Sequence, residues 1–256
     1  MKRRIKNLGA IASFLALLLA AAVLAEPQQE PIGPDSINQL GSSRHTPAAI
    51  PSRPAYAGNV TELSVYTQTT TLGWQGYYGN VTGTIVLDDA NNHTMYDWAI
   101  AHPEGEIYAV IQPVADWDQV SCATPAQIST IENNTYKFNT YPNGTLKPSL
   151  DADSITNTFA ANFDGDFYVG STRINATSGC KAAYLYVNDA PDPSKKFTET
   201  LLYDQVNANL IFTAILVENT ATGFDGLPHD FQMIVAENGH NGDETTTTYY
   251  FYVELQ

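Results

Sequence analysis

Short runs of alternating apolar and polar residues make up the chain from residue 59 to its end. The runs are rich in Thr, Val, Ile, Tyr and Phe, and turn-forming pairs such as Asn143-Gly144 and Asp225-Gly226 separate them. About eleven strands at this spacing predict an all-β fold, an antiparallel β-sandwich. The expected strands are 60–71, 81–87, 95–101, 106–112, 158–163, 167–171, 181–187, 198–203, 210–217, 231–236 and 249–255. The short link 102–105 predicts a hairpin between the third and fourth of them.

One segment predicts a short helix, at about residues 125–132. Thr124 suits the N-cap, Pro125 suits the first turn, and Gln127 lies three residues after the cap, as in a capping box. No other stretch after residue 25 shows sustained 3.6-residue periodicity. The helix is therefore expected as a single addition to the sheets.

The first 25 residues have the pattern of a secretory signal peptide. Four basic residues at positions 2–6 precede an apolar run, and Val23 and Ala25 fit cleavage after Ala25. The alternative is an uncleaved anchor, since residues 8–25 are just long enough to span a bilayer. Residues 26–58 hold six prolines, which predicts an extended linker. The expected organisation is signal peptide 1–25, linker 26–58 and β-sandwich domain 59–256.

The charge balance limits the partners of the chain. Its formal net charge is −15, and without residues 1–25 it keeps 8 basic and 27 acidic residues, a net charge of −19. Such a chain repels nucleic acid and anionic lipid surfaces, so neither is an expected partner. After signal cleavage no membrane insertion is expected, and the predicted location is secreted or at the cell surface.

Two chemical modifications are predicted for an exported chain. Cys122 and Cys180 are the only cysteines, and in an oxidising compartment they are expected to form one disulfide. Six Asn-x-Ser/Thr sequons are candidate glycosylation sites on a glycoprotein. The sequon asparagines are Asn59, Asn80, Asn92, Asn133, Asn143 and Asn175.

Motifs for catalysis are absent from the sequence, but tight pairs of aspartates occur. There is no H-E-x-x-H zinc motif, no G-x-S-x-G elbow and no phosphate-binding loop. Asp164 and Asp166 are candidate ligands of a structural calcium ion, and no other cofactor is expected. Two carboxylates across a cleft would instead suit a glycoside hydrolase. The candidates for that role are Asp116, Asp118, Asp164 and Asp166. Turn-capping aspartates are the simpler interpretation of all four.

Aromatic residues provide a second kind of candidate site. Exposed Trp and Tyr rings can stack on sugars, and glycine allows close approach of the backbone. The alternative is that these rings pack inside the sandwich. The candidate ligand-binding residues are Trp74, Tyr77, Tyr78 and Trp117.

Three segments, WQGYYGNVTGTIVLDD, MYDWAIAHPEGEIYAV and GFDGLPHDFQMIV, carry a resemblance. Over residues 57–256 the chain resembles a group of secreted, mostly archaeal, cell-surface proteins. The resemblance implies an exported all-β protein and supplies no catalytic residues.

These observations together favour a non-enzymatic extracellular protein with a structural or adhesive role. Its expected partners are other surface proteins or further copies of itself, and glycans are a further possibility. In one version the proline-rich segment 26–58, or its continuation 60–66, pairs with the open sheet edge of a neighbouring copy and builds a filament. A carbohydrate-binding module is the first alternative, and a glycoside hydrolase is the second.

Overall fold

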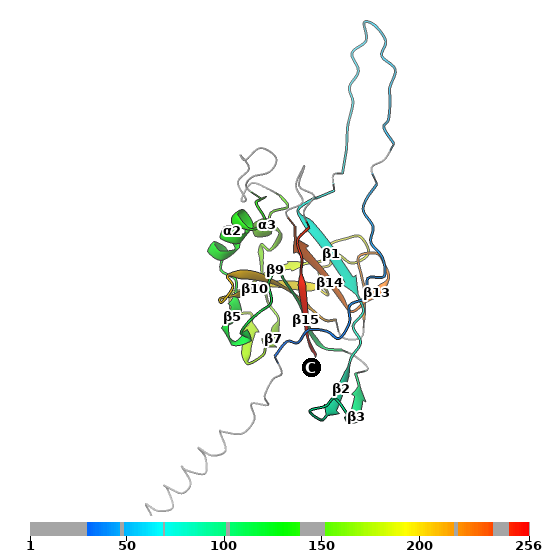
Figure 1. The fold of residues 1–256 in the computed structure, drawn as a ribbon. Coiled ribbons are helices and arrows are strands. Elements are labelled where there is room, and N and C mark those ends of the chain that lie inside the picture. Colours follow the sequence, from blue (N-terminus) through cyan, green and yellow to red (C-terminus); the bar gives the residue numbers. More distant parts are fainter. Residues whose placement is uncertain are drawn as a thin grey trace, which may run out of the picture.

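The protein is built mainly of antiparallel strands (Figure 1), which confirms the predicted all-β class. The computed structural model describes residues 30–46, 49–68, 70–100, 103–138, 152–217, 220–237 and 246–255. The predicted signal peptide, residues 1–25, lies outside this part of the chain.

One seven-stranded sheet forms the centre of the molecule. Its strands are β4 (Gly105–Val110), β5 (Val120–Cys122), β6 (Ala161–Asn162), β9 (Lys181–Tyr184), β10 (Thr198–Asp204), β11 (Asn209–Ile215) and β15 (Tyr250–Leu255). Their order across the sheet is β15-β4-β11-β10-β9-β6, with β5 also beside β10, and every pair is antiparallel. Strand β15 is therefore one edge of this main sheet.

Smaller elements surround the main sheet. Four two-stranded sheets pair β1 (Trp74–Gly79) with β14 (Phe231–Ala236), β2 (Thr84–Asp88) with β3 (Thr94–Ala99), β7 (Asp166–Val169) with β8 (Thr172–Asn175), and β12 (Ala221–Thr222) with β13 (Pro228–His229). The helices are η1 (Trp117–Gln119), α2 (Pro125–Asn134) and α3 (Ile155–Thr158).

The main sheet has an apolar core on each face, because successive side chains of a strand point to opposite sides. On β4, Ala109 belongs to a cluster with residues of α2, α3 and β14. Its neighbours Tyr108 and Val110 belong to a second cluster with β7, β8 and Trp117. The central strands are consequently buried on both sides, which agrees with a sandwich.

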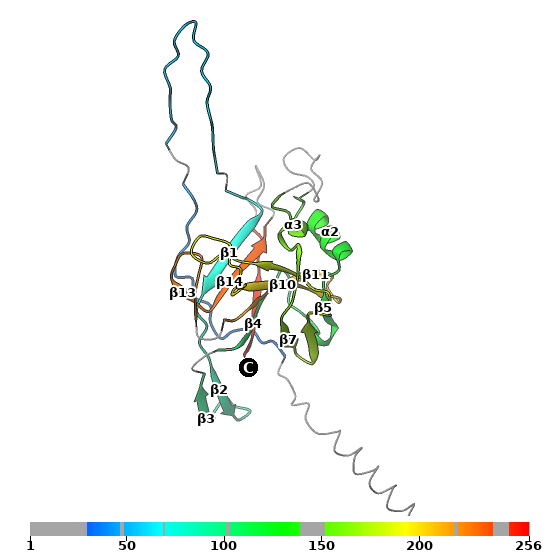
Figure 2. The same ribbon diagram turned by 180° about the vertical axis from the view of Figure 1, so that it is seen from behind.

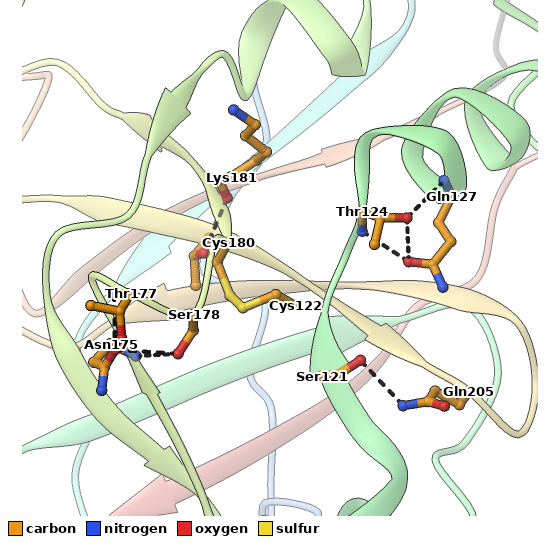
Figure 3. The surroundings of a disulfide bond; sticks show 11 residues. Ser121, Cys122, Thr124, Gln127, Asn175, Thr177, Ser178, Cys180, Lys181 and Gln205 are labelled. Carbon is orange, nitrogen blue, oxygen red and sulfur yellow. Dashed lines mark hydrogen bonds between the residues drawn. A yellow bond between two sulfur atoms is a disulfide. The ribbon is translucent and has the colours of Figure 1, made fainter.

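The disulfide prediction is confirmed, and the topology explains its position. Strands β5 and β9 lie end to end along the same side of β10, with Cys122 opposite Leu202 and Lys181 opposite Leu201. Cys180 directly precedes β9, and the Cα atoms of the two bonded cysteines are 4.7 Å apart (Figure 3). The bond thus joins two strand ends that no backbone ladder connects.

The predicted helix is also confirmed. Thr124 Oγ1 accepts a hydrogen bond from Gln127 N at 3.3 Å, and Gln127 Oε1 accepts one from Thr124 N at 2.8 Å (Figure 3). This reciprocal pair is the capping box that the sequence predicts. The helix continues to Asn134, and Ile128 and Ile131 bury its inner side.

The structure differs from the prediction at the 102–105 hairpin and at two of the expected strands. The expected hairpin across residues 102–105 does not form, since β3 pairs with β2 whereas β4 pairs with β11 and β15. The expected strand 60–71 has no ladder among its described residues, because none of the strands that the structure describes lies beside it. The expected run 158–163 divides between the end of α3 and the two-residue strand β6. The segment that begins at Trp74 forms β1.

Candidate functional site

Three of the four predicted aromatic binding residues pack against the apolar cores: Trp117 is buried, and Trp74 and Tyr77 are half-buried. Trp74 packs against Phe138, Phe159 and Phe212 with ring centroids 6.2–6.4 Å apart, and its Nε1–H donates to the Asp153 carbonyl at 2.6 Å. Trp117 is 4% exposed within the second core. Carbohydrate binding therefore stays a prediction, and the buried Trp117 offers no free ring face for it.

Tyr77 and Tyr78 point in opposite directions from β1. The ring of Tyr77 lies 5.2 Å from that of Phe251, and burial raises the pKa of its hydroxyl. Tyr78 is 52% exposed and contacts Phe224 and His229, with centroids 4.9 and 4.7 Å away. Tyr78 is accordingly the predicted aromatic residue best placed to meet a ligand.

A hollow lies beside the Tyr78 cluster. Its volume is about 480 Å³, and its lining mixes one aromatic ring with polar side chains and a glycine. The lining residues are Asn188, Asp189, Phe224, Asp225 and Gly226. An aromatic face next to amide and carboxylate groups is a combination that can bind a polar, ring-shaped ligand.

The predicted acidic pair Asp164 and Asp166 is occupied by basic side chains. Asp164 accepts a hydrogen bond from Lys195 Nζ at 2.5 Å, and Asp166 forms a two-point ion pair with Arg173. These hydrogen bonds lower the pKa of both carboxyl groups, so both stay ionised at neutral pH. Calcium binding here stays a prediction, and no cluster of three or more metal-ligating side chains occurs in the described ranges.

The other predicted catalytic pair has structural contacts on an exposed turn. Asp116 caps η1 by accepting a hydrogen bond from Asp118 N at 3.0 Å. Asp118 Oδ1 accepts another from the Ser171 hydroxyl at 2.8 Å. Both contacts fit the interpretation of these residues as turn-capping aspartates.

The sequons differ in accessibility. Asn59, Asn80 and Asn92 are exposed, whereas Asn175 lies in β8 and is partly buried. Asn133 lies on α2, where its Nδ2 donates to the Ser129 carbonyl at 2.8 Å. Asn143 lies outside the described residues. Glycosylation stays a prediction for all six.

The outer edge of β15 is a candidate binding site that the sequence did not reveal. Ile32 N donates to Val253 O at 3.0 Å, and Val253 N donates to Ile32 O at 2.8 Å. The backbone N–H and C=O groups of Val253 therefore point away from β4. Because the direction of these groups alternates along a strand, the N–H and C=O groups of Phe251 and Leu255 point away from β4 as well. Only Ile32 pairs with this edge in the part of the chain that the structure describes.

A second edge lies close to it. The Gly73 and Gly79 carbonyls accept hydrogen bonds from the segment around β14, so the backbone groups of Gly76 point to the other side of β1. Half-buried apolar side chains lie along this part of the first core. They include Tyr77, Val81, Phe251, Val253 and Leu255. Topology creates this surface, which explains why local patterns did not predict it.

A long arm connects Ile32 to β1 (Figure 1). Its described residues, between 33 and 73, form no strand and are almost all exposed. At its far end Asn59 N donates to Tyr56 O at 3.2 Å across a turn that contains Gly58, whose φ is +85°. The arm therefore consists of two extended limbs joined by a turn.

Comparison of the chain with family models, curated proteins and solved structures gives no match. Among the described residues, no helix has the length and apolar content needed to cross a membrane. What this chain can do is therefore inferred from its own geometry.

Proposed function

We propose that this protein is a non-enzymatic structural component of the cell exterior that assembles with copies of itself by strand exchange. The observation that carries the proposal is the limb 60–68, which has the sequence of a strand but no strand beside it in the described part of the chain. A partner from another copy would supply the missing ladder. The signal-like N-terminus and the single disulfide support an extracellular location.

The limb has the composition that strand pairing requires. No proline occurs between Pro54 and Pro103, so every residue of this limb keeps its N–H donor. Leu63 and Val65 alternate on one face and are 63% and 84% exposed. Burying both side chains would contribute about 4 kcal/mol, before any ladder hydrogen bonds are counted.

The outer edge of β15 is the proposed acceptor. Ile32 already shows that an extended N-terminal segment can form an antiparallel bridge there. The half-buried side chains between β15 and β1 would gain cover from a donor strand. Since the donor and acceptor surfaces differ, repeated exchange would produce an open chain of subunits, that is, a filament.

A carbohydrate-binding role is the second candidate. It is supported by the exposed Tyr78 cluster and the neighbouring hollow of about 480 Å³. Loss of glycan-array binding in Tyr78→Ala, with the fold retained, would support it. No observation in the described chain favours the hydrolase alternative over either of these.

Proline substitution in the limb tests the proposal. Proline removes ladder donors, and the limb makes no ladder within the monomer, so Leu63→Pro combined with Val65→Pro should leave the domain folded. The expected result in light scattering is assembly of the exported chain and a monomer for the double variant. Ser52→Pro, in the proline-rich limb, is the matched control and should still assemble. Monomers for all three proteins, or equal assembly of all three, would contradict strand exchange.

A further inference from the structure

The outer edge of β15 is partly covered by a segment of the same chain. In both views this segment, drawn in dark blue, crosses the body near the end of the main sheet and then leads into the arm (Figure 1, Figure 2). Its Ile32 lies opposite Val253, and the two residues exchange both backbone hydrogen bonds, at 3.0 and 2.8 Å. We call residues 30–34 the cover segment.

The bridge takes the central position of the edge. Val253 is the middle one of the three β15 residues whose backbone groups point outward, between Phe251 and Leu255. Its N–H and its carbonyl are both engaged by Ile32. A donor strand therefore cannot form a continuous ladder along this edge while the bridge is present.

Further contacts hold the cover segment in place. Pro31 is buried and Pro34 is half-buried. Glu30 lies against the turn between β7 and β8, because a Cβ atom on Gly170 would be 3.5 Å from Glu30 Cγ. The segment thus fits between β15 and this turn, and its position on the edge is specific.

The sequence of the cover segment limits its pairing to one bridge. With Ile32 opposite Val253, an antiparallel ladder would place Pro34 opposite Phe251 and Glu30 opposite Leu255. Proline has no N–H, so Pro34 cannot donate to Phe251. No backbone hydrogen bond joins Glu30 to Leu255 in the described structure. The cover segment is therefore a weak occupant of the edge.

The limb 60–68 does not have this restriction. It contains no proline, so it can donate at every position along the edge and can pair with Phe251, Val253 and Leu255 together. The cover segment has a different advantage, since it belongs to the same chain and its local concentration does not depend on dilution. Competition between the two segments consequently depends on the protein concentration.

Release of the cover segment requires no other part of the described fold to open. The arm that follows it forms no strand in its described residues, which are almost all exposed. A released segment would stay attached to β1 through this arm. The exchange is therefore a local event at the edge of the main sheet.

We propose that the cover segment is an autoinhibitory contact, which blocks the edge of β15 in the monomer until the limb 60–68 of a second copy displaces it. The inference rests on the proposed strand exchange and concerns the regulation of the same edge. A covered edge protects a monomer from indiscriminate pairing. Assembly then begins only where the concentration of the chain is high.

A peptide of residues 60–68 tests the inference on a chain that does not assemble. The receptor is the exported chain with Leu63→Pro and Val65→Pro, and fluorescence anisotropy follows binding of the labelled peptide. Adding Ile32→Pro removes the N–H that donates to Val253, so the peptide should bind about 5-fold more tightly. Ile37→Pro is the matched control: this isoleucine of the same arm is 64% exposed, and its variant should bind like the receptor without it.

A locked receptor gives the reverse test. Residues that exchange both hydrogen bonds across two strands have Cα atoms about 5.5 Å apart, a distance that a disulfide can span. Ile32→Cys with Val253→Cys, once mass spectrometry has identified the new bond, should bind no peptide. Reduction should restore binding. The receptor without these cysteines, treated with the same reductant, controls for reduction of the Cys122–Cys180 bond.

The outcomes separate this inference from the proposed function. If the peptide binds the receptor with and without Ile32→Pro equally well, the autoinhibitory contact is overturned and strand exchange stands. Weaker binding after Ile32→Pro would also overturn it, because the bridge would then shape the edge for the donor. If the peptide binds none of the receptors, the acceptor edge is wrong, and the proposed strand exchange fails together with its regulation.

Discussion

Glu106 on β4 and Glu254 on β15 lie directly opposite each other in the main sheet, and both are buried. Glu254 Oε2 accepts a hydrogen bond from the Tyr108 hydroxyl at 2.9 Å, whereas Glu106 Oε2 has no hydrogen-bond partner in the described structure. Burial, together with repulsion from Glu254, raises the pKa of Glu106 to about 9. Burial raises the pKa of Glu254 to about 7. Strand β15, whose outer edge is the proposed acceptor, therefore faces β4 across a pair of buried acids, and the raised pKa values of both favour the protonated form.

This pair predicts lower stability at alkaline pH. Both pKa values are higher in the folded chain than the ordinary value of 4.5, so the folded state binds more protons. The stabilisation is complete below pH 4.5 and is lost as the pH rises through about 7 and then 9. The Tm of the native chain should therefore fall between pH 5 and pH 9.

Glu106→Gln should flatten that profile, because glutamine keeps the shape of the side chain and cannot ionise. At pH 9 we expect it to raise the unfolding free energy by about 2 kcal/mol, roughly 4–8 °C in Tm for a domain of this size. Glu104→Gln, at an exposed position two residues earlier, is the control and should keep the native profile. Parallel profiles for native chain and Glu106→Gln would contradict the assignment.

Local features of the fold were predictable from the sequence. The capping box of Thr124 and Gln127 depends on residues three apart, and strand alternation depends on neighbours two apart. The disulfide was predictable because only Cys122 and Cys180 are present. Each of these predictions needs no knowledge of which strands are neighbours in space.

Relationships between distant segments were not predictable in the same way. The run before Pro103 and the run after it are adjacent in sequence, yet β4 pairs with β11 and β15, more than 90 residues away. Among the described strands, the same topology makes β15 an edge and leaves the limb 60–68 without a neighbouring strand. Glu106 and Glu254 did carry a signal, since each is a charged residue within an apolar run, but only the register shows that they face each other.

The disulfide should contribute strongly to stability. In the chain-entropy view, closing a loop across a sequence separation of 58 stabilises the fold by about 4 kcal/mol. Replacing both cysteines by alanine should therefore lower the Tm by roughly 10 °C, measured by circular dichroism. A reducing agent should lower the Tm of the native chain by a similar amount and leave the double variant unchanged. Equal melting of native and double-variant chains would show that β5 and β9 hold their positions without the bond.

Substitutions on β1 should lower the unfolding free energy much more on its core-facing side than on its exposed side. Trp74→Ala removes a ring that packs on three aromatic neighbours, so we expect a loss of about 3 kcal/mol in unfolding free energy. Tyr78→Ala removes a half-exposed ring and should cost less than about 1 kcal/mol. Urea unfolding measures both. A larger loss for Tyr78→Ala than for Trp74→Ala would mean that the two faces of β1 have been assigned the wrong way round.

Gly105 should be intolerant of any side chain, because it begins β4 with a φ of +126° against the backbone of β15. A Cβ atom at this position would lie 1.9 Å from the Glu254 carbonyl oxygen. Gly105→Ala must therefore displace β15, and we expect a loss of about 3 kcal/mol or more in urea unfolding, with early loss of the Glu106–Glu254 pairing. Gly76→Ala is the matched control: that glycine is also in a strand, no atom would lie within 4 Å of its Cβ, and its loss should stay below about 1 kcal/mol. Equal unfolding free energies for the two variants would contradict the close approach of β4 and β15.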